Sequence, residues 1–565
     1  MVDRSHGEKS GYHVAMHVLS AAEMQACDRA TAERFGVPSL QLMRAAAGAV
    51  ADFAQRNFPH ARQVTTLCGR GNNGGDGMMA ARLLAAAGLE VTTILLGTAD
   101  GLKGDAAAAW RELADSPHGP IHIITTADEL KMHTQELAVD LILDAVVGTG
   151  FKPPLTGLAL AAAEWVRGSQ APILAVDLPS GWPADATAAT VDGAVFPADA
   201  VVTFTAPQPA HVFGQLTRQW DQPIIVAPIG SPEAAMESDL QLDWAGAAHR
   251  LVEKRRAATA NKGDFGHVLV VGGSLGLVGG KAGAPAMTAL AALRGGAGLV
   301  TAAVPAPALR LVATVAQELM TWPLEETATG QISEANLAPG IVTAITAGKT
   351  VLAIGPGLGQ GMEVARFTLG LLQATRVPAV IDADALNTLA AHPGALAEIA
   401  KDRFVAVTPH PGEMARLAGI TTAEVQANRL DVARGFARIN GVTVVLKGWR
   451  TLIAHADGRV AVNTTGNPGM AKGGSGDVLT GLVAGLLAQF PSEPEAAVEA
   501  AVHLHGLAAD LTVRAEEEHT LLATDSLRLL ARAFRFRSSG QSGYVWLQGL
   551  PGDMVPAIRA REAAE

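Results

Sequence analysis

Short apolar runs alternate with longer stretches of helical spacing along most of the chain. In the first 230 residues the apolar runs are rich in Val, Ile and Leu, and the stretches between them are rich in Ala. Continuous runs of this kind are typical of strands in a parallel sheet that helices cover on both faces. The runs lie at 64–68, 91–96, 141–147, 173–178, 200–204 and 224–228. The alternation predicts a doubly wound α/β domain over residues 15–230.

A second pattern of the same kind starts after a polar segment. Residues 231–261 carry scattered charges, including the run Glu253-Lys254-Arg255-Arg256, and indicate a linker. Further strands are expected at 267–271, 298–304, 350–354, 379–382, 404–408, 442–446 and 451–455. We therefore expect a second α/β domain over 262–535. Residues 536–565 combine a Ser- and Gly-rich stretch with closing charges, and indicate an appended tail of the kind that is often disordered.

Composition narrows the class of protein. The chain has 565 residues, 49% hydrophobic and 17% charged, which allows a sizeable core in three to four ordinary domains or two large ones. A net charge of −11 argues against a protein dominated by nucleic-acid backbone contacts. The two cysteines cannot form a disulfide framework, and they fit a reducing cytosol. With no apolar signal region and no uninterrupted span of about 20 apolar residues, we expect a cytoplasmic protein without a membrane partner.

The most informative loop follows the first strand. Residues 69–77 read G-R-G-N-N-G-G-D-G, with a strand before and a helical stretch after. This satisfies G-x-G-x-x-G, in which glycines let the backbone approach a pyrophosphate and the helix start offers free N–H groups. The acid usual at the end of the next strand is missing, because residues 95–98 read Leu-Leu-Gly-Thr, so ordinary NAD redox binding is not expected. A ligand-free glycine turn is the alternative, which two Asn and an Asp among five Gly disfavour.

Two more polar segments stand at strand ends, where open α/β sheets bind ligands. They are D-A-V-V-G-T-G-F-K-P-P at 144–154 and V-D-L-P-S-G at 176–181. Asp144, Asp177 and Ser180 could converge with Asn73 on an oxygen-rich cation site. Taken singly, each Asp could equally be a helix or turn cap.

These three segments, in this order, resemble the NAD(P)H-hydrate epimerases, which have a Rossmann-like fold. The resemblance covers about residues 15–230 and implies that Asp177 contacts the substrate and is the catalytic acid/base. It implies K⁺ ligands at Asn73, Asp144 and Ser180. It implies further contacts to the hydrated nucleotide from Asn72, Asn73, Gly74, Gly75, Asp76, Gly148, Thr149, Gly150, Phe151, Lys152, Pro153 and Pro154. Interconverting R and S forms at C6 of the nicotinamide ring needs reversible bond-breaking and proton transfer, and a positioned carboxylate can move the proton.

The second domain carries a longer set of loops. They are G-K-A-G-A-P-A at 280–286, G-P-G-L-G at 355–359, T-P-H-P-G-E at 408–413, L-K-G-W-R-T at 446–451 and N-P-G-M-A-K-G-G-S-G-D at 467–477. The first is not a Walker A loop, because Ala282 follows the Lys. Glycines that lead into a helix build an anion-binding hollow, and Asp477 at its head can take a proton from a hydroxyl that faces a phosphate. The alternative for Asp477 is a plain helix cap.

G-x-G-D resembles the ribokinase superfamily, and the whole set resembles the ADP-dependent (S)-NAD(P)H-hydrate dehydratases over about residues 250–530. This implies a ribokinase-like α/β fold, Asp477 as catalytic base, ADP as co-substrate and Mg²⁺. Substrate contacts are implied at Ala284, Gly357, His410 and Asp477. An ADP site is implied at Lys447, Gly448, Trp449, Arg450, Thr451, Gly473, Gly474, Ser475 and Gly476. Lys472 departs from the pattern, in which a small or hydroxyl residue is more usual.

Together the resemblances imply metabolite repair. An epimerase that converts the R form into the S form would supply a dehydratase, which phosphorylates the C6 hydroxyl and eliminates phosphate to restore NAD(P)H, with AMP as the second product. The partners would then be hydrated NADH or NADPH and ADP, in a homo-oligomer without nucleic acid. The alternative is a vitamin-precursor kinase domain, of thiazole or pyrimidine type, fused to a non-catalytic nucleotide-binding module. The preference between the two hydrated nucleotides, and between ADP and ATP, stays open.

Overall fold

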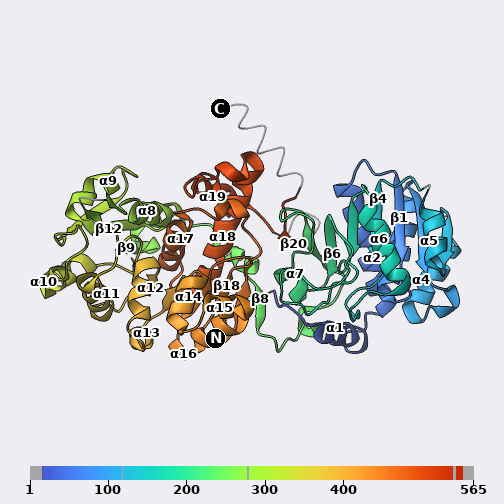
Figure 1. The fold of residues 1–565 in the computed structure, drawn as a ribbon, viewed down its shortest axis with the longest axis horizontal. Coiled ribbons are helices and arrows are strands. Elements are labelled where there is room, and N and C mark those ends of the chain that lie inside the picture. The colour runs from blue at the N-terminus through green and yellow to red at the C-terminus, as the bar shows by residue number, and fades with distance from the viewer. Residues whose placement is uncertain (1–15, 117–118, 136, 277–278, 539–542, 552–565) are drawn as a thin grey trace, which may run out of the picture. The chain divides into compact units, whose positions relative to one another are not determined.

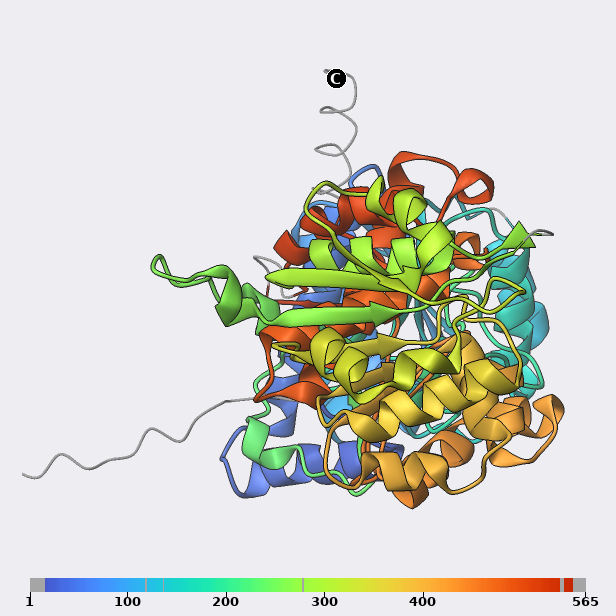
Figure 2. The same cartoon turned by 90° about the vertical axis from the view of Figure 1, so that its left-hand side faces the viewer.

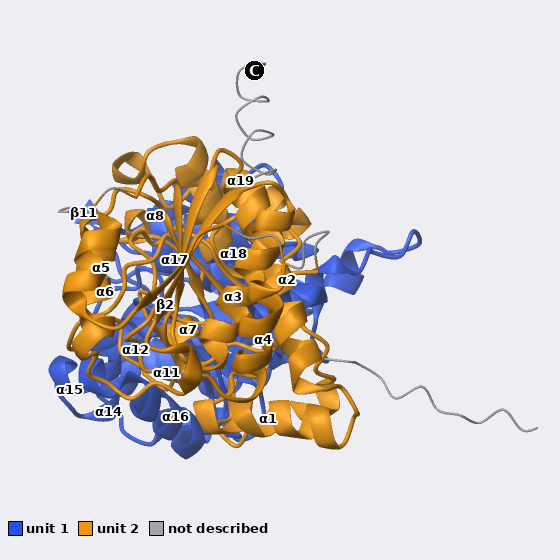
Figure 3. Ribbon diagram, turned by 90° about the vertical axis from the view of Figure 1, so that its right-hand side faces the viewer, with its two compact units in different colours: residues 1–16, 243–463, 472–505 blue, residues 17–242, 464–471, 506–565 orange. Residues whose placement is uncertain are grey.

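The computed structural model describes residues 16–116, 119–135, 137–276, 279–538 and 543–551. The chain forms two compact units, which are coloured separately in Figure 3. Unit 1 contains Asp243–Asn463 and Lys472–His505, and unit 2 contains His17–Leu242, Thr464–Ala471 and the chain from Gly506 on. No helix in the described ranges is both long enough and apolar enough to span a lipid bilayer.

The described part of unit 2 is built on an eight-stranded sheet, in the order β20-β7-β6-β5-β4-β1-β2-β3. All neighbours are parallel except β20 and β7. The strands are β1 (Gln63–Cys68), β2 (Glu90–Leu96), β3 (Ile121–Ile124), β4 (Leu141–Ala145), β5 (Ile173–Val176), β6 (Ala200–Phe204), β7 (Ile224–Ala227) and β20 (Val545–Gln548). The chain runs outward from β1 to β2 and β3 and then returns to β4 on the other side of β1. Ligands bind at such a reversal of strand order, beyond the carboxyl ends of the strands.

Helices cover both faces of this sheet (Figure 1). One face packs against α2, α3 and α4, and the other against α5 and α6. The helices of unit 2 are α1 (Ala21–Glu33), α2 (Ser39–Asn57), α3 (Asn72–Ala86), α4 (Gly104–Ala114), α5 (Ala127–Thr134), α6 (Gly157–Gly168), α7 (Pro209–Phe213) and α19 (Asp525–Arg535). The start of α3 is the predicted glycine loop, so its free N–H groups lie beside the carboxyl end of β1.

The segment expected as a tail contains a strand. Within 536–565, strand β20 pairs antiparallel with β7 and closes that edge of the sheet. Trp546 packs with its ring centroid 6.1 Å from that of Phe53, and the Tyr544 hydroxyl donates to Asp52 Oδ2 at 2.6 Å. The short strand was missed because a Ser- and Gly-rich stretch precedes it and only three of its residues pair with β7. Residues 539–542 and 552–565 lie outside the described residues.

Unit 1 contains, within its described residues, a ten-stranded sheet in the order β13-β12-β9-β14-β15-β16-β17-β18-β19-β8. Pairing is parallel from β13 to β17 and antiparallel from β17 to β19. The strands are β8 (Leu242–Trp244), β9 (His267–Val271), β12 (Leu299–Pro305), β13 (Met320–Leu324), β14 (Val351–Ile354), β15 (Ala379–Ile381), β16 (Val405–Val407), β17 (Thr443–Leu446), β18 (Leu452–Ala454) and β19 (Val460–Val462), beside a two-stranded ribbon of β10 (Leu275–Gly276) and β11 (Gly279–Gly280). The linker expected over 231–261 therefore contributes a strand, β8, which the charges around it concealed.

Helices lie on both sides of this second sheet as well (Figure 2). They are α8 (Gly283–Arg294), α9 (Leu309–Ala313), α10 (Pro339–Thr346), α11 (Met362–Ala374), α12 (Ala383–Ala390), α13 (Ala395–Ala400), α14 (Pro411–Ala418), α15 (Thr422–Ala427), α16 (Arg429–Asn440), α17 (Ser475–Gln489) and α18 (Pro494–Ala515), which continues into unit 2 from Gly506. Helices α17 and α8 touch closely, because a Cβ on Gly481 would stand 2.1 Å from Thr288 O. The expected fold class, two α/β domains on largely parallel sheets, is confirmed.

Candidate active sites

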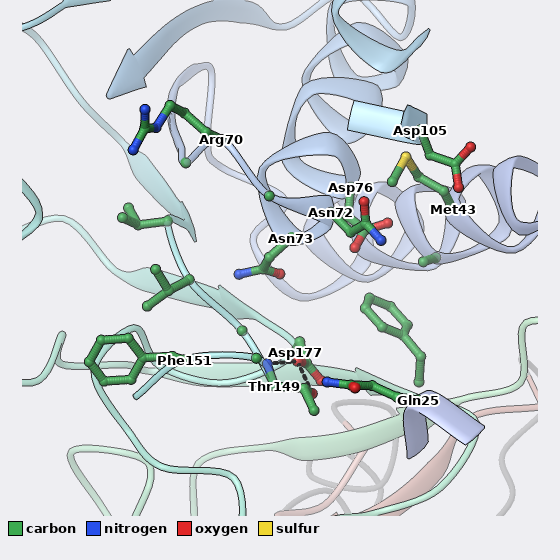
Figure 4. A pocket seen from close by; sticks show the side chains of 18 of the residues that line it. Gln25, Met43, Arg70, Asn72, Asn73, Asp76, Asp105, Thr149, Phe151 and Asp177 are labelled. Atoms are coloured by element: carbon green, nitrogen blue, oxygen red, sulfur yellow. Dashed lines mark hydrogen bonds between the residues drawn. The ribbon is translucent and has the colours of Figure 1, made fainter. Parts of the chain in front are cut away.

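A cavity of about 920 Å³ opens at the carboxyl ends of β1, β4 and β5 in unit 2 (Figure 4). The sequence-predicted residues that line it are Asn72, Asn73, Asp76, Gly148, Thr149, Gly150, Phe151, Lys152 and Asp177. Gly74 and Gly75 do not line it but allow close packing. A Cβ on Gly74 would stand 1.9 Å from Gly69 O, and one on Gly75 would stand 2.7 Å from Met43 Cε. Pro153 and Pro154 continue the loop in exposed positions outside the lining.

Asp177 is held in one position by four contacts. Its Oδ2 accepts from the Thr149 backbone N at 2.9 Å and from Thr149 Oγ1 at 2.7 Å, and its Oδ1 accepts from Thr203 Oγ1 at 3.1 Å. His211 Nε2 lies 2.8 Å from the Asp177 carbonyl oxygen, and His211 Nδ1 accepts from the Gln208 N, so the neutral ring carries its proton on Nε2 and donates it. Asp177 has φ 68°, a left-handed conformation that costs a non-glycine residue free energy. The carboxylate is thus fixed at the cavity wall.

Asp144 and Ser180, two of the three residues expected at an oxygen-rich cation site, are joined by hydrogen bonds. Asp144 is fully buried, with Oδ2 accepting from Ser180 N at 2.7 Å and Oδ1 accepting from Ser180 Oγ at 2.6 Å. Burial raises the pKa of Asp144 to about 6, although the bonds from Ser180 oppose the rise. Both polar atoms of the Asn73 side chain are buried and have no hydrogen-bond partner in the described chain. A bound water or ion would satisfy these atoms, and the oxygens of Asn73, Asp144 and Ser180 suit a hard cation.

The same cavity is lined by several carboxyl groups. Burial raises the pKa of Asp76 well above its ordinary value, and the neighbouring carboxylates of Asp177, Asp28 and Asp105 add to the rise. Asp28 comes from α1 and Asp105 from α4, and the same cavity is lined by Gln25 and Met43 from α1 and α2. Sequence reasoning missed these residues because no motif marks the helices that carry them. It also missed Thr203 and His211, which act only through Asp177.

A second site gathers at the carboxyl ends of β14 to β17 in unit 1. Asp477 lies in the first turn of α17, and Lys447 follows β17. Lys447 Nζ lies 3.0 Å from Asp382 Oδ1, and a Cβ on Gly476 would stand 3.3 Å from the same Nζ, so Lys447 abuts the start of α17. Burial alone would lower the pKa of Lys447, but Asp382 and Glu413 raise it, so the ammonium stays charged. Burial raises the pKa of Asp477 to about 6, helped by Asp382 and opposed by Lys447 and Lys281.

The expected substrate contacts lie in loops on this edge of the sheet. A Cβ on Gly357 would stand 2.6 Å from Lys281 O and 3.2 Å from Ala284 Cβ, so the 281–284 and 355–359 loops touch. His410 follows β16 and caps α14, with Nδ1 accepting from Gly412 N at 3.0 Å. Its side chain is about half exposed, and Nε2 lies 3.5 Å from Oε1 of the buried Glu413.

The 447–451 loop, where the sequence predicts an adenine-nucleotide site, exposes an aromatic ring. Trp449 is 41% exposed, and the Arg450 guanidinium carbon lies 4.5 Å from its ring centroid. Arg429, which sequence reasoning missed, donates to Leu446 O at 3.2 Å and Lys447 O at 3.3 Å and so fixes the loop. An exposed aromatic ring suits stacking of a base. Lys472 is exposed in the turn before α17, where Ser475 N donates to its carbonyl oxygen at 3.4 Å.

No group of three or more His, Cys, Asp or Glu side chains suited to a metal ion occurs among the described residues. The cation site proposed by the sequence is of a different kind, because it relies on Asn, Ser and a single Asp. In the second site, a cation bound to the nucleotide would have Asp382 and Asp384 as candidate ligands. Each of these carboxylates forms an ion pair with a different lysine.

Comparisons with known proteins cover both units. A family model described as NAD(P)H-hydrate dehydratase matches residues 268–532, and one described as YjeF-related protein N-terminus matches residues 39–210. A bifunctional NAD(P)H-hydrate repair enzyme of Moorella thermoacetica is 38% identical over 533 residues, covering 92% of this chain and 97% of that protein. The enzyme of the same name from Escherichia coli is 35% identical over 528 residues, covering 93% and 95%. A crystal structure of an ADP/ATP-dependent NAD(P)H-hydrate dehydratase from Bacillus subtilis is 30% identical, covers 52% of this chain and 96% of that one, and has a TM-score of 0.42. From the match to the full-length relatives, the chain belongs to the family of bifunctional NAD(P)H-hydrate repair enzymes.

Proposed function

We propose that this chain repairs hydrated NADH and NADPH at two separate active sites. The cavity of unit 2 interconverts the R and S epimers, and the site of unit 1 dehydrates the S epimer at the expense of ADP. The observation that carries the proposal is that one chain, matched over 92% of its length by a repair enzyme, keeps a positioned carboxylate at the strand-end edge of each of its two sheets.

In the epimerase site, Asp177 is the acid/base. Thr149 and Thr203 fix its carboxylate, so that it can take a proton from the substrate and return it while a bond at C6 breaks and re-forms. The loops at 72–76 and 148–154 hold the nucleotide around it. Asn73, Asp144 and Ser180 would hold K⁺, whose positive charge would offset the buried Asp144 carboxylate and satisfy the Asn73 amide oxygen.

In the dehydratase site, Asp477 removes the proton of the C6 hydroxyl as its oxygen attacks the β-phosphorus of ADP. The bond between the β-phosphorus and its bridging oxygen breaks and AMP leaves. The N–H groups of 473–476 and the Lys447 ammonium face the transferred group. Elimination then restores the ring: the bond from C6 to the phosphate oxygen breaks, C5 loses a proton to solvent or to the departing phosphate, and the C5–C6 double bond forms. Phosphorylation makes this step easier, because phosphate leaves far more readily than hydroxide. Ala284, Gly357 and His410 contact the hydrated nucleotide, and the 447–451 loop holds the adenine nucleotide.

Mg²⁺ would accompany the nucleotide phosphates, as it does in other phosphoryl transfers. Asp382 and Asp384 are carboxylates on this edge of the sheet that could face it, although each already contacts a lysine, Lys447 and Lys281 respectively. We further propose a homo-oligomer in the cytoplasm. The buried, unpaired thiols of Cys27 and Cys68 support the reducing compartment.

The fusion of a vitamin-precursor kinase to a non-catalytic module is not favoured. That reading predicts no functional carboxylate in unit 2, yet Asp177 lies at the cavity wall in a left-handed conformation, with its carboxylate held by Thr149. Matches at 35–38% identity extend through both units to proteins named for repair.

The test is a paired assay on purified R and S hydrated NADH, with and without ADP. We expect the S form with ADP to yield NADH and AMP in equal amounts, and the R form without ADP to yield S. The R form with ADP should be repaired completely. Accumulation of a phosphorylated alcohol from ATP without recovery of NADH would instead establish a kinase.

A further inference from the structure

Arg70 occupies a position that the repair mechanism does not use. It stands in the turn between β1 and α3, and its side chain lies across the loop after β2. A Cβ on Gly97 would stand 2.8 Å from Arg70 Cδ, and one on Gly101 would stand 3.2 Å from the same atom. Gly97 also has φ 130°, which favours glycine. A side chain at Gly97 would therefore be strained and would also collide with Arg70. Arg70 and the end of β2 at Leu96 both line the cavity.

The end of β2 is where dinucleotide-binding folds distinguish the two forms of the adenosine ribose. A carboxylate at this place accepts from the free 2′-hydroxyl, whereas an arginine accommodates a 2′-phosphate. Here β2 is followed by Gly97 and Thr98, and the first acid after the strand is Asp100, which is exposed and lies outside the cavity lining. The basic group of Arg70 thus stands where the hydroxyl-selecting acid is missing.

The Arg70 guanidinium is available for a ligand. The residue is exposed, and in the described part of the chain no carboxylate oxygen comes within ion-pairing distance of it. Its aliphatic stem rests on two glycines, so the planar fork is presented without much freedom to lose on binding. A guanidinium that meets a phosphate through two parallel N–H donors makes one of the stronger side-chain contacts.

The described lining of the cavity carries two cations, Arg70 and Lys152, and several carboxyl groups. Asp76 and Asp105 line it at the start of α3 and α4, and in Figure 4 they lie on the far side of Asn73 from Arg70. A phosphate group is therefore disfavoured beside this group of acids and favoured at a cation such as Arg70.

We propose that Arg70 binds the 2′-phosphate of hydrated NADPH and makes the epimerase site selective for hydrated NADPH over hydrated NADH. The assignment rests on the proposed epimerase function and adds the choice between its two substrates.

The test compares the wild type with R70A and R70K in the full-length chain, measuring epimerisation without ADP on each nucleotide separately. The wild type is expected to have a kcat/KM at least about tenfold higher for hydrated NADPH. R70A should lose about 10- to 100-fold with hydrated NADPH, chiefly through KM, and stay within about twofold with hydrated NADH. R70K should fall between, because a lysine offers a point charge without the fork. Equal losses with both nucleotides would place Arg70 on the shared pyrophosphate instead, and no loss with either would remove it from the substrate.

A binding measurement separates this proposal from the proposed function. Titration with 2′,5′-adenosine bisphosphate and with 5′-AMP should show weaker binding of the bisphosphate to R70A than to the wild type, and equal binding of 5′-AMP. The binding comparison can be made even if the chain turns over neither hydrated nucleotide. Such a lack of turnover would overturn the proposed epimerase function, and the binding data would still decide whether Arg70 contacts the 2′-phosphate. R111A is the matched control, because Arg111 is exposed on α4 of the same unit and lies outside the cavity lining. If R70A binds the bisphosphate as tightly as the wild type does, relative to 5′-AMP, the proposal is overturned.

Discussion

At the scale of single residues, each site holds a carboxylate whose pKa burial raises to about 6, with a different consequence in each unit. Asp477 has to be ionised to accept a proton. Its raised pKa brings its ionisation close to the working pH and makes the ionised carboxylate a stronger base. Asp144 has no proton to move in the proposed mechanism, and burial raises its pKa because the hydrogen bonds from Ser180 only partly offset the loss of solvent around its charge.

The first prediction concerns the pH dependence of dehydration. Because Asp477 acts ionised, kcat/KM should fall about tenfold for each pH unit below about 6. Asp382 raises the pKa of Asp477, so D382N should shift the acidic fall in kcat/KM to lower pH. D402N removes an exposed carboxylate and should leave this fall unchanged. Rate measurements from pH 4.5 to 8 would check it, and a fall that D382N leaves in place would contradict it.

The second prediction concerns Asp144 and potassium. Its pKa is raised on folding from 3.8 to about 6, so the unfolded chain loses this proton first and stability falls as pH rises between those values. At pH 7 the cost is about 3 kcal/mol without a cation. Thermal unfolding of unit 2, followed through epimerase activity, should therefore show a Tm gain from K⁺ at pH 7.5 and a smaller one at pH 5. D144N should abolish the dependence, and an equal K⁺ effect in D144N would contradict the assignment.

At the scale of elements, the sequence predicted the site loops better than the residues elsewhere in the chain that hold those loops in place. The 69–77, 144–154 and 176–181 segments each carry several unusual residues at a strand end, and parallel strands bring such ends to one edge. Arg429, Thr203 and His211 act from elsewhere as single residues, and nothing local distinguishes a buried His or Arg with a structural partner from any other. Strand β20 was missed for a related reason, since its partner β7 lies more than 300 residues away along the chain.

The third prediction concerns the contact between α17 and α8. A methyl group on Gly481 would stand 2.1 Å from Thr288 O, so G481A has to push α17 away and shift Asp477. We expect a loss of about 1–3 kcal/mol in stability and a fall in dehydratase kcat, with epimerase activity kept. G435A is the control, because Gly435 lies inside α16 with nothing within 4 Å, and it should stabilise by up to about 1 kcal/mol. Equal effects of the two variants would contradict the packing argument.

The fourth prediction concerns strand β20. Trp546 is 7% exposed and packs beside Phe53 of α2, so W546A should destabilise unit 2 by about 3–5 kcal/mol. Epimerase activity should then be lost at lower urea, while dehydratase activity keeps its midpoint. M132A removes an apolar side chain that is 69% exposed on α5 and should stay within about 0.5 kcal/mol. An unchanged epimerase midpoint in W546A would mean that β20 is dispensable.

At the scale of the whole molecule, the expectation of two large α/β domains was sound, but the sequence boundaries describe them incompletely. Thr464–Ala471 and the chain from Gly506 on belong with unit 2, although they follow the second domain in sequence. The pattern of apolar residues indicates local secondary structure. It does not indicate which of two hydrophobic cores a segment distant in sequence packs against. The two active sites are nevertheless each built from one unit: the cavity lining lies wholly in unit 2, and Asp477, Lys447, His410 and Gly357 all lie in unit 1.

The last prediction follows from that separation. If each site is complete within its unit, the S-form nucleotide passes between them through solution, and the two reactions do not need one chain. D177N should lose about 10²- to 10⁴-fold in epimerisation and keep dehydration, and D477N should do the reverse. Equal amounts of the two variants should together repair a racemic mixture as fully as the wild type, measured as NADH recovered above the blank for spontaneous epimerisation. The double variant D177N/D477N is the control, and mixed single variants that repair only the S half would show that the sites have to act within one chain.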